Sequence, residues 1–125
     1  MAYEVFTRTA IRVETPTLSI TTDGRIAINA AGVRILLSAG VRFVQLLWDS
    51  TIKRMALKAA PKGDKNSYAV SITPDKHAGS LRAKSFLSHI GWKASQRMTF
   101  PAIWNEKERM LEVALPPAHL KQSSN

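Results

Sequence analysis

The fold expected for this chain is decided by residues 18–40, LSITTDGRIAINAAGVRILLSAG. Isoleucine and leucine alternate with polar residues on both sides of Asp23-Gly24, the type of dipeptide most typical of a tight β-hairpin turn. Asn29 then offers a side chain that can cap a helix over residues 30–39, and Gly40 is the residue type that usually ends one. The stretch therefore predicts a hairpin that leads directly into a short helix.

The elements expected after this stretch occur in a similar order in both halves of the chain. Two β-rich runs, 41–48 and 52–59, flank a turn, and a polar segment at residues 61–66 then divides the sequence nearly in half. In the second half we expect short strands, a short helix that ends at Gly91, and a final strand pair. The sequence thus predicts a mostly β fold with short helices, a β-rich member of the α+β class.

Some identities support a repeat, since Ser19-Ile20-Thr21 recurs as Ser71-Ile72-Thr73. One unit of this size does not easily bury its own apolar face, so two units would complete one core. We expect a first unit over residues 1–62 and a degenerate second copy over residues 63–125, with a loose tail from Pro116. Chance similarity among strand-forming sequences is the alternative.

The charge of the chain points to acidic partners. The 125 residues include 18 Lys and Arg against 9 Asp and Glu, a formal net charge of +9. Such a field attracts nucleic acid, anionic lipid or acidic protein. Arginine outnumbers lysine in the first half, and its forked guanidinium suits phosphates and guanine edges, so a recognition face is expected there unless the difference is a drift in composition.

Motifs for other kinds of chemistry are missing from the sequence. Cysteine is absent, the three histidines are isolated, and Asp75 and His77 form the only pairing of note, in an expected loop. No phosphate-binding glycine loop or nucleophile elbow occurs, so we expect no catalytic residue, no metal, no cofactor and no enzyme activity. The tryptophans and phenylalanines, which could stack on bases, are expected to be core residues.

No segment of the sequence fits a membrane span or a secretion signal. The longest stretch without a charged residue, Asn66 to Pro74, is far shorter than the roughly twenty apolar residues that a bilayer helix needs. The first residues carry Glu4 and Arg8 around Phe6, unlike a signal peptide. A cytoplasmic location without membrane contact is therefore expected.

Residues 18–60 resemble the AbrB-like, swapped-hairpin family of bacterial DNA-binding domains. The resemblance lies in the Gly24-Arg25 turn, the strand that follows it, the helix and the two later strands. It implies a barrel shared by two copies that exchange hairpins, and DNA contacts by Arg25 and Arg34. Asn29 stands where the family usually has proline, and Leu18 stands where its best-known members carry an arginine.

These observations together predict a DNA-binding transcriptional regulator of the AbrB-like type. Duplex DNA is the expected partner, bound by a homodimer or higher oligomer through basic residues of the first unit. The candidate DNA-binding residues are Arg8, Arg12, Arg25, Arg34 and Arg42. The alternative is a non-enzymatic protein-interaction or assembly module with the same fold, which turns its basic face to an acidic protein and binds no DNA.

Overall fold

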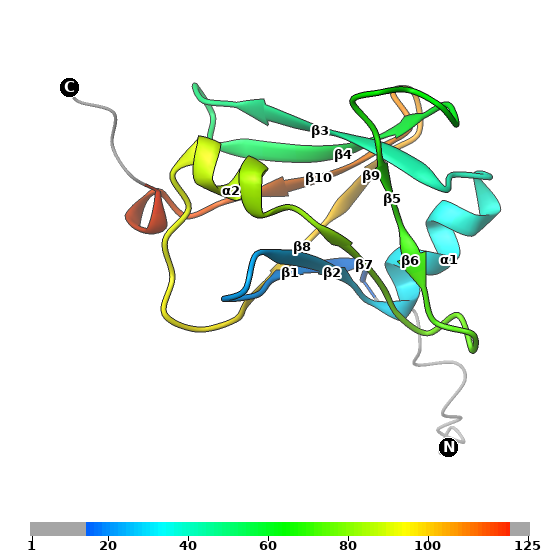
Figure 1. The fold of residues 1–125 in the computed structure, drawn as a ribbon, viewed down its shortest axis with the longest axis horizontal. Coiled ribbons are helices and arrows are strands. Elements are labelled where there is room, and N and C mark those ends of the chain that lie inside the picture. Colours follow the sequence, from blue (N-terminus) through cyan, green and yellow to red (C-terminus); the bar gives the residue numbers. More distant parts are fainter. Residues whose placement is uncertain (1–14, 121–125) are drawn as a thin grey trace, which may run out of the picture.

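Two antiparallel five-stranded sheets face one another, and a short helix lies at each end between them (Figure 1). The computed structural model describes residues 15–120. Sheet A has the strand order β6 (Ser71–Ile72), β7 (Gly79–Arg82), β2 (Arg25–Ile28), β1 (Thr17–Ile20) and β8 (Met98–Pro101). Sheet B has the order β5 (Tyr68–Ala69), β3 (Phe43–Asp49), β4 (Arg54–Ala60), β10 (Met110–Ala114) and β9 (Ile103–Asn105). The helices are α1 (Ala30–Ser38), α2 (Lys84–Ile90) and a 3-10 turn, η1 (Pro117–His119). The prediction of a mostly β fold with short helices is confirmed.

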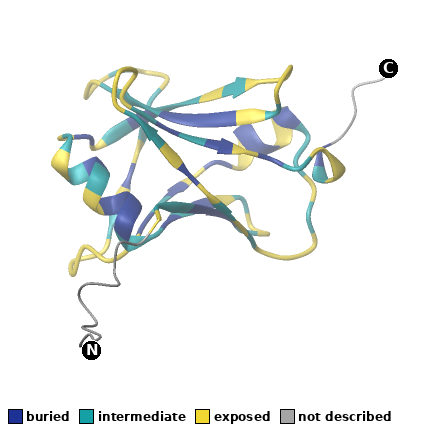
Figure 2. Ribbon diagram, turned by 180° about the vertical axis from the view of Figure 1, so that it is seen from behind, coloured by how far each residue is buried: buried dark blue, intermediate teal, exposed yellow. Residues whose placement is uncertain are grey.

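The core lies between the two sheets and takes residues from both halves of the chain. Buried positions occur in the strands of both sheets and in both helices (Figure 2). Fully buried side chains include Ile26 of sheet A and Leu57 and Leu111, which pair across β4 and β10 of sheet B. Because one cluster contains all of them, neither half of the chain has a core of its own.

The predicted hairpin and helix form as the local sequence dictates. Gly24 has a φ of +90° in the β1–β2 turn, a conformation that favours glycine. The Oδ1 atom of Asn29 caps α1 by accepting a hydrogen bond from the backbone N–H of Gly32 at 3.0 Å. Gly40 at φ +71° follows the C-terminal end of α1, and Gly91 at φ +80° ends α2.

Neither sheet closes into a barrel, which corrects the barrel that the family resemblance implies. The segments 68–72 and 98–105, which form the edge strands of both sheets, each change sheets midway. The first breaks at buried Val70, whose N–H donates to the carbonyl of Arg42 at 3.0 Å. The second breaks at buried Ala102, whose N–H donates to the carbonyl of Pro16 at 2.8 Å. These two bends connect a pair of facing sheets.

The prediction of a loose tail from Pro116 is wrong as far as residue 120. Leu120 is buried and forms an isolated antiparallel bridge with Trp92. The carbonyl of His119 accepts a hydrogen bond from the N–H of Lys93 at 2.7 Å. The chain is held here because Leu120 has apolar surface to cover.

The two halves of the chain follow matching paths. Sheet A is centred on the β7–β2 pair and sheet B on the β4–β10 pair, so each sheet joins equivalent hairpins from the two halves. The turn residues Lys53 and Arg109 have φ values of 56° and 54°. Their carbonyls accept hydrogen bonds from Leu115 and Ala59 respectively, both at 2.9 Å. The turn of each hairpin in sheet B thus bonds to the other hairpin in the same way.

Candidate nucleic-acid interface

The outer face of sheet A has a floor of small side chains. Successive side chains of a strand point to opposite faces of the sheet. Because the isoleucines of β1 and β2 are buried in the core, the residues next to them lie on the outer face. One register row crosses all five strands on this side, and its residues are Ser71, Ser80, Ala27, Ser19 and Thr99. The hydroxyls of Ser19 and Thr99 are hydrogen bonded at 2.7 Å. Ser19 is buried, Ser80 and Ala27 are half-buried, and Ser71 and Thr99 at the two ends of the row are exposed. The row is therefore open to a partner at its β6 and β8 ends.

Two arginines stand directly opposite one another on this face. Arg25 begins β2, Arg82 ends β7, and the two residues are register partners. Both are exposed, with 45% of the Arg25 side chain accessible to solvent. Like charges directly opposite in a sheet repel one another, and an anion bound between them would remove the repulsion. The pair is thus a preformed site of positive charge.

A shallow cavity accompanies this arginine pair. Its volume is about 410 Å³, and its lining includes Arg25, Arg82, Ser71, Ser80 and Tyr68. No carboxylate lines it. The cavity offers guanidinium and hydroxyl donors on one side of the sheet, the donor set that proteins use for phosphate oxygens.

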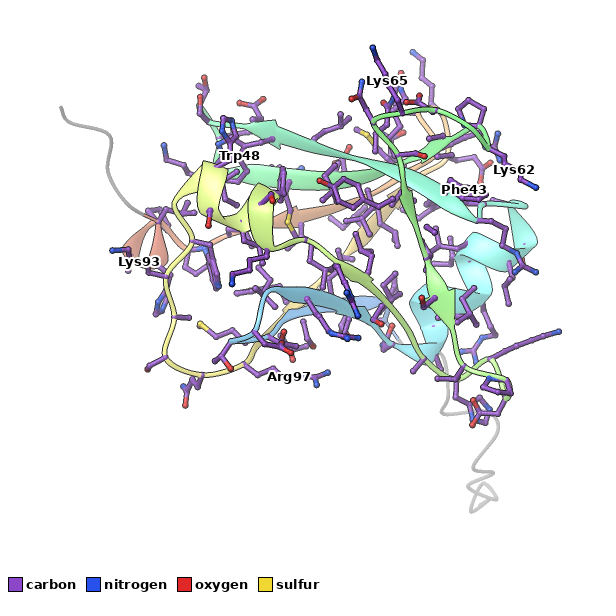
Figure 3. The ribbon with its side chains drawn as sticks, in the orientation of Figure 1. Phe43, Trp48, Lys62, Lys65, Lys93 and Arg97 are labelled. Carbon is purple, nitrogen blue, oxygen red and sulfur yellow. The ribbon has the colours of Figure 1, made fainter. Side chains whose placement is uncertain are left out.

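A third arginine lies on the same side of the molecule. Arg97 immediately precedes β8 and shares the outward alternation of Thr99. It is exposed, and Figure 3 shows its side chain below sheet A, away from sheet B. We call Arg25, Arg82 and Arg97 the arginine cluster.

One carboxylate lies beside the arginine cluster. Asp23 Oδ2 is 3.9 Å from Arg25 Nε, with both side chains well exposed. A hydrogen bond from the Thr21 hydroxyl is the main reason that the pKa of Asp23 lies below its ordinary value of 3.8, and the charge of Arg25 lowers this pKa further. Asp23 is therefore ionised at neutral pH, but an ion pair this exposed holds Arg25 only weakly.

Of the three sequence-predicted arginines that lie within the described residues, the structure brings one, Arg25, into this cluster. Arg34 is exposed on α1, and Arg42 is exposed between α1 and β3. They belong to the end of the molecule opposite the β1–β2 turn (Figure 1). Arg8 and Arg12 lie outside the described residues, so their assignment stays a prediction.

Two members of the cluster, Arg82 and Arg97, were missed by the sequence prediction. Alternation around buried Leu81 indicates that Ser80 and Arg82 share the outward face of their strand. This alternation indicates the face of the sheet on which Arg82 lies, but it does not indicate which residue of another strand lies beside it. Only the long-range register of β2 with β7 places Arg82 opposite Arg25.

The other candidate chemistries occur as turn or core features. Asp75 accepts hydrogen bonds from the Thr73 hydroxyl at 2.6 Å and from the N–H of His77 at 3.1 Å, which stabilise an exposed turn and lower the pKa of Asp75. Within residues 15–120, no group of three or more acidic or histidine side chains could hold a metal ion. No helix in the same range has the length and apolar character of a bilayer span.

The aromatic side chains contribute mainly to the core, as the sequence predicts. Phe86 is buried, and five other described aromatic residues pack against the core while partly exposed, namely Trp48, Tyr68, Trp92, Phe100 and Trp104. Phe43 is half-buried and lies outside the core cluster. None of these rings belongs to the arginine cluster.

Comparison with known proteins adds no relative: no protein-family model, no curated protein and no solved structure matches this chain. The resemblance to the AbrB-like family therefore stays a prediction.

Proposed function

We propose that this protein is a transcriptional regulator that binds duplex DNA through the outer face of sheet A. The observation that carries the proposal is the pairing of Arg25 with Arg82 on adjacent central strands. Both guanidinium groups are exposed beside a floor of serines, and Arg97 extends the charge toward the β8 edge. The net charge of +9 supplies the long-range attraction.

The width of sheet A determines how DNA is contacted. Strands are spaced about 4.8 Å apart, so five of them are wider than the major groove of about 12 Å. The sheet therefore lies across the phosphate backbones, and its arginine side chains reach the phosphate oxygens. Binding of this kind depends strongly on salt and weakly on base sequence.

We also propose that the chain contains two interleaved swapped-hairpin units. The mirrored strand orders and the reciprocal bonds of Lys53 and Arg109 support it. The turns of sheet A add a second correspondence. The Thr21 hydroxyl accepts the N–H of Arg25 at 2.9 Å, and the Thr73 hydroxyl accepts the N–H of Ala78 at 3.2 Å. The hairpin exchange that the family makes between two protomers would here occur within one chain.

The same correspondence favours a homodimer on DNA. Ala78 occupies the position equivalent to Arg25, so the arginine cluster is not duplicated within the chain. Two chains would bring two arginine clusters to the phosphate backbones of one duplex. The dimer would add a second cluster rather than complete the fold.

Fluorescence anisotropy with a labelled random duplex tests DNA binding directly. We expect binding at 50 mM salt that weakens by about tenfold or more at 200 mM, because bound phosphates release counterions. The corresponding single strand is the comparison. Absence of binding to duplex at the lower salt would overturn the proposal.

A second candidate function is protein assembly through the outer face of sheet B. One register row on this face runs Leu47, Ala56, Glu112, Ile103, and its two end residues are exposed by 37% and 61%. Arg54 pairs with Glu112 at 3.3 Å beside this row. Exposed apolar residues flanked by ion pairs are typical of a subunit contact. The partner would be a second copy, or an acidic protein that meets the basic residues of the chain.

Light scattering coupled to size-exclusion chromatography checks this second candidate. If sheet B forms the contact, the protein runs as a dimer, and Ile103→Lys dissociates it because a lysine would be buried in the interface. Ile52→Lys is the matched control, since Ile52 is equally exposed but lies in the β3–β4 turn. A protein that stays monomeric at high concentration would exclude sheet B as a homodimer contact.

A further inference from the structure

A second concave region lies at the α2 end of the molecule, and Asp23 and Gly24, the residues just before Arg25, belong to its lining. Its volume is about 710 Å³, within the range of roughly 300–1,000 Å³ that is usual for small-molecule sites. The walls come from the β1–β2 turn, α2, the loop of residues 91–97 and η1. We call it the α2 cavity.

The α2 cavity breaks the approximate symmetry of the fold. Residues 39–42 suffice to connect α1 to β3, whereas α2 needs the longer loop of residues 91–97 to reach β8. This longer loop supplies Trp92, Lys93 and Ser95 to the cavity wall. The equivalent connection at the α1 end is too short to build such a wall. A loop longer than the fold requires is often kept for binding.

The wall of the α2 cavity is held in place by several contacts. The N–H of Lys93 donates to the carbonyl of His119 at 2.7 Å, and His119 Nδ1 lies 3.0 Å from the carbonyl of Lys93. The Trp92 ring meets Phe100 edge-on, with centroids 5.8 Å apart, and lies 5.5 Å from the His119 ring. A wall fixed in this way offers a preformed surface to a ligand, which lowers the entropic cost of binding.

The residues of the α2 cavity define the chemistry of its ligand. Lys84 and Lys93 line it, and among residues 15–120 neither is paired with a carboxylate. Thr22 and Ser88 add hydroxyls to the lining, and Trp92 adds an aromatic surface. The lining also contains one carboxylate, Asp23, which is ionised and lies beside the Thr21 hydroxyl and Arg25, so the two lysines outnumber it. Two lysines, hydroxyls and an indole suit an anion that carries a planar ring.

We propose that the α2 cavity binds a small phosphorylated ring compound of the mononucleotide class. The phosphate lies between Lys84 and Lys93, and the base lies against the exposed part of the Trp92 indole. This binding does not depend on DNA binding by sheet A, because the two regions use different cations. The cavity adds a small-molecule ligand to a protein whose proposed function is to bind DNA.

Isothermal titration calorimetry on the full chain without DNA tests the proposal. The probes are the adenosine, guanosine, cytidine and uridine monophosphates, the four nucleosides and inorganic phosphate. We expect one-to-one binding of at least one monophosphate with a dissociation constant below about 1 mM. The matching nucleoside and inorganic phosphate should each bind at least about tenfold more weakly, because each lacks one of the two contacts.

Charge-matched variants locate the site. Lys84→Gln/Lys93→Gln should weaken the monophosphate at least about tenfold, whereas Lys62→Gln/Lys65→Gln should leave it unchanged. All four lysines are exposed, and Figure 3 shows Lys62 and Lys65 far from Lys93. In the NMR spectrum of the unmodified protein, the indole N–H signal of Trp92 should shift on titration.

Several results would overturn the proposal. They are a lack of binding by all four monophosphates at millimolar concentration, equal affinity for inorganic phosphate, and equal weakening by the two lysine pairs. Binding of single-stranded oligonucleotides without binding of mononucleotides would identify the α2 cavity as part of a nucleic-acid surface instead. Because no arm contains duplex DNA, these outcomes are independent of the test of sheet A.

Discussion

Gly24 shows how a single residue shapes the proposed interface. It has a φ of +90°, and a Cβ atom placed on it would come within 2.8 Å of Lys84 Cβ and 3.0 Å of Lys84 Cα. Gly63 has almost the same φ, +92°, but its Cβ would meet nothing within 4 Å. Gly24 is therefore needed both because its backbone has a positive φ and because there is no room for a Cβ atom, whereas Gly63 is needed only for its positive φ. The close approach at Gly24 brings the β1–β2 turn, and Arg25 with it, against α2.

This pair of glycines gives a matched stability prediction. We expect Gly63→Ala to lower the free energy of unfolding by about 1 kcal/mol, through backbone strain. Gly24→Ala should lower it by about 2–3 kcal/mol, because the same strain is joined by a clash with the backbone of Lys84. Urea unfolding of both variants measures the two values. Equal losses would show that the contact with Lys84 is not close in solution.

Helix α1 shows what the sequence can predict at the scale of an element. Asn29 and Gly40 mark its ends in the sequence, and the helix lies between them, because capping is local chemistry. The sequence did not show that Asn29 also joins α1 to β1. Its Oδ1 accepts the N–H of Thr17 at 2.9 Å, and its Nδ2 donates to the carbonyl of Thr15 at 3.0 Å. A proline, the usual residue of the resembled family at this position, could make none of these side-chain bonds.

Replacing Asn29 should therefore lower the free energy of unfolding by more than replacing an ordinary helix-capping residue does. Asn29→Ala removes the acceptor of both Gly32 and Thr17, and we expect a loss of about 2 kcal/mol in the free energy of unfolding, the upper end for a capping residue. Asn66→Ala is the control, because Asn66 is exposed in a loop and should change stability by less than about 0.5 kcal/mol. Thermal unfolding of both proteins compares them. If Asn29→Ala lowered the stability no more than Asn66→Ala does, this would contradict the role of Asn29 in joining α1 to β1.

At the scale of the whole molecule, the sequence predicts the local elements well and their pairing poorly. The alternation of residues around Leu81 indicates that Arg82 points outward. It does not indicate which residue lies opposite Arg82, because the register of β2 with β7 joins residues far apart in the chain. The buried Leu120 was taken for part of a loose tail, because nothing local shows the surface that it covers. Contacts of this kind depend on the completed core, and the arginine cluster depends on them in turn.

The interleaving of the two halves predicts how a cut chain behaves. A protease site inserted between Lys62 and Gly63 enters an exposed loop with open space around Gly63. After cleavage we expect the two fragments to stay together and keep a cooperative melting transition. The reason is that the β2–β7 and β4–β10 pairs and the single core hold them. Size-exclusion chromatography and near-ultraviolet circular dichroism follow the result. Separation into two folded fragments would contradict one shared core.

The central claim, that the Arg25–Arg82 pair binds DNA, is tested most directly by a comparison of two charge-matched variants. Arg25→Gln/Arg82→Gln and Lys62→Gln/Lys65→Gln each remove two positive charges, the first from sheet A and the second from the loop after β4. Duplex affinity is measured by anisotropy over a series of salt concentrations. The account predicts that the arginine variant loses about tenfold or more in affinity and about two from the salt slope, while the lysine variant keeps both nearly unchanged. Equal losses in the two variants would show that net charge alone attracts DNA, and the claim would be wrong.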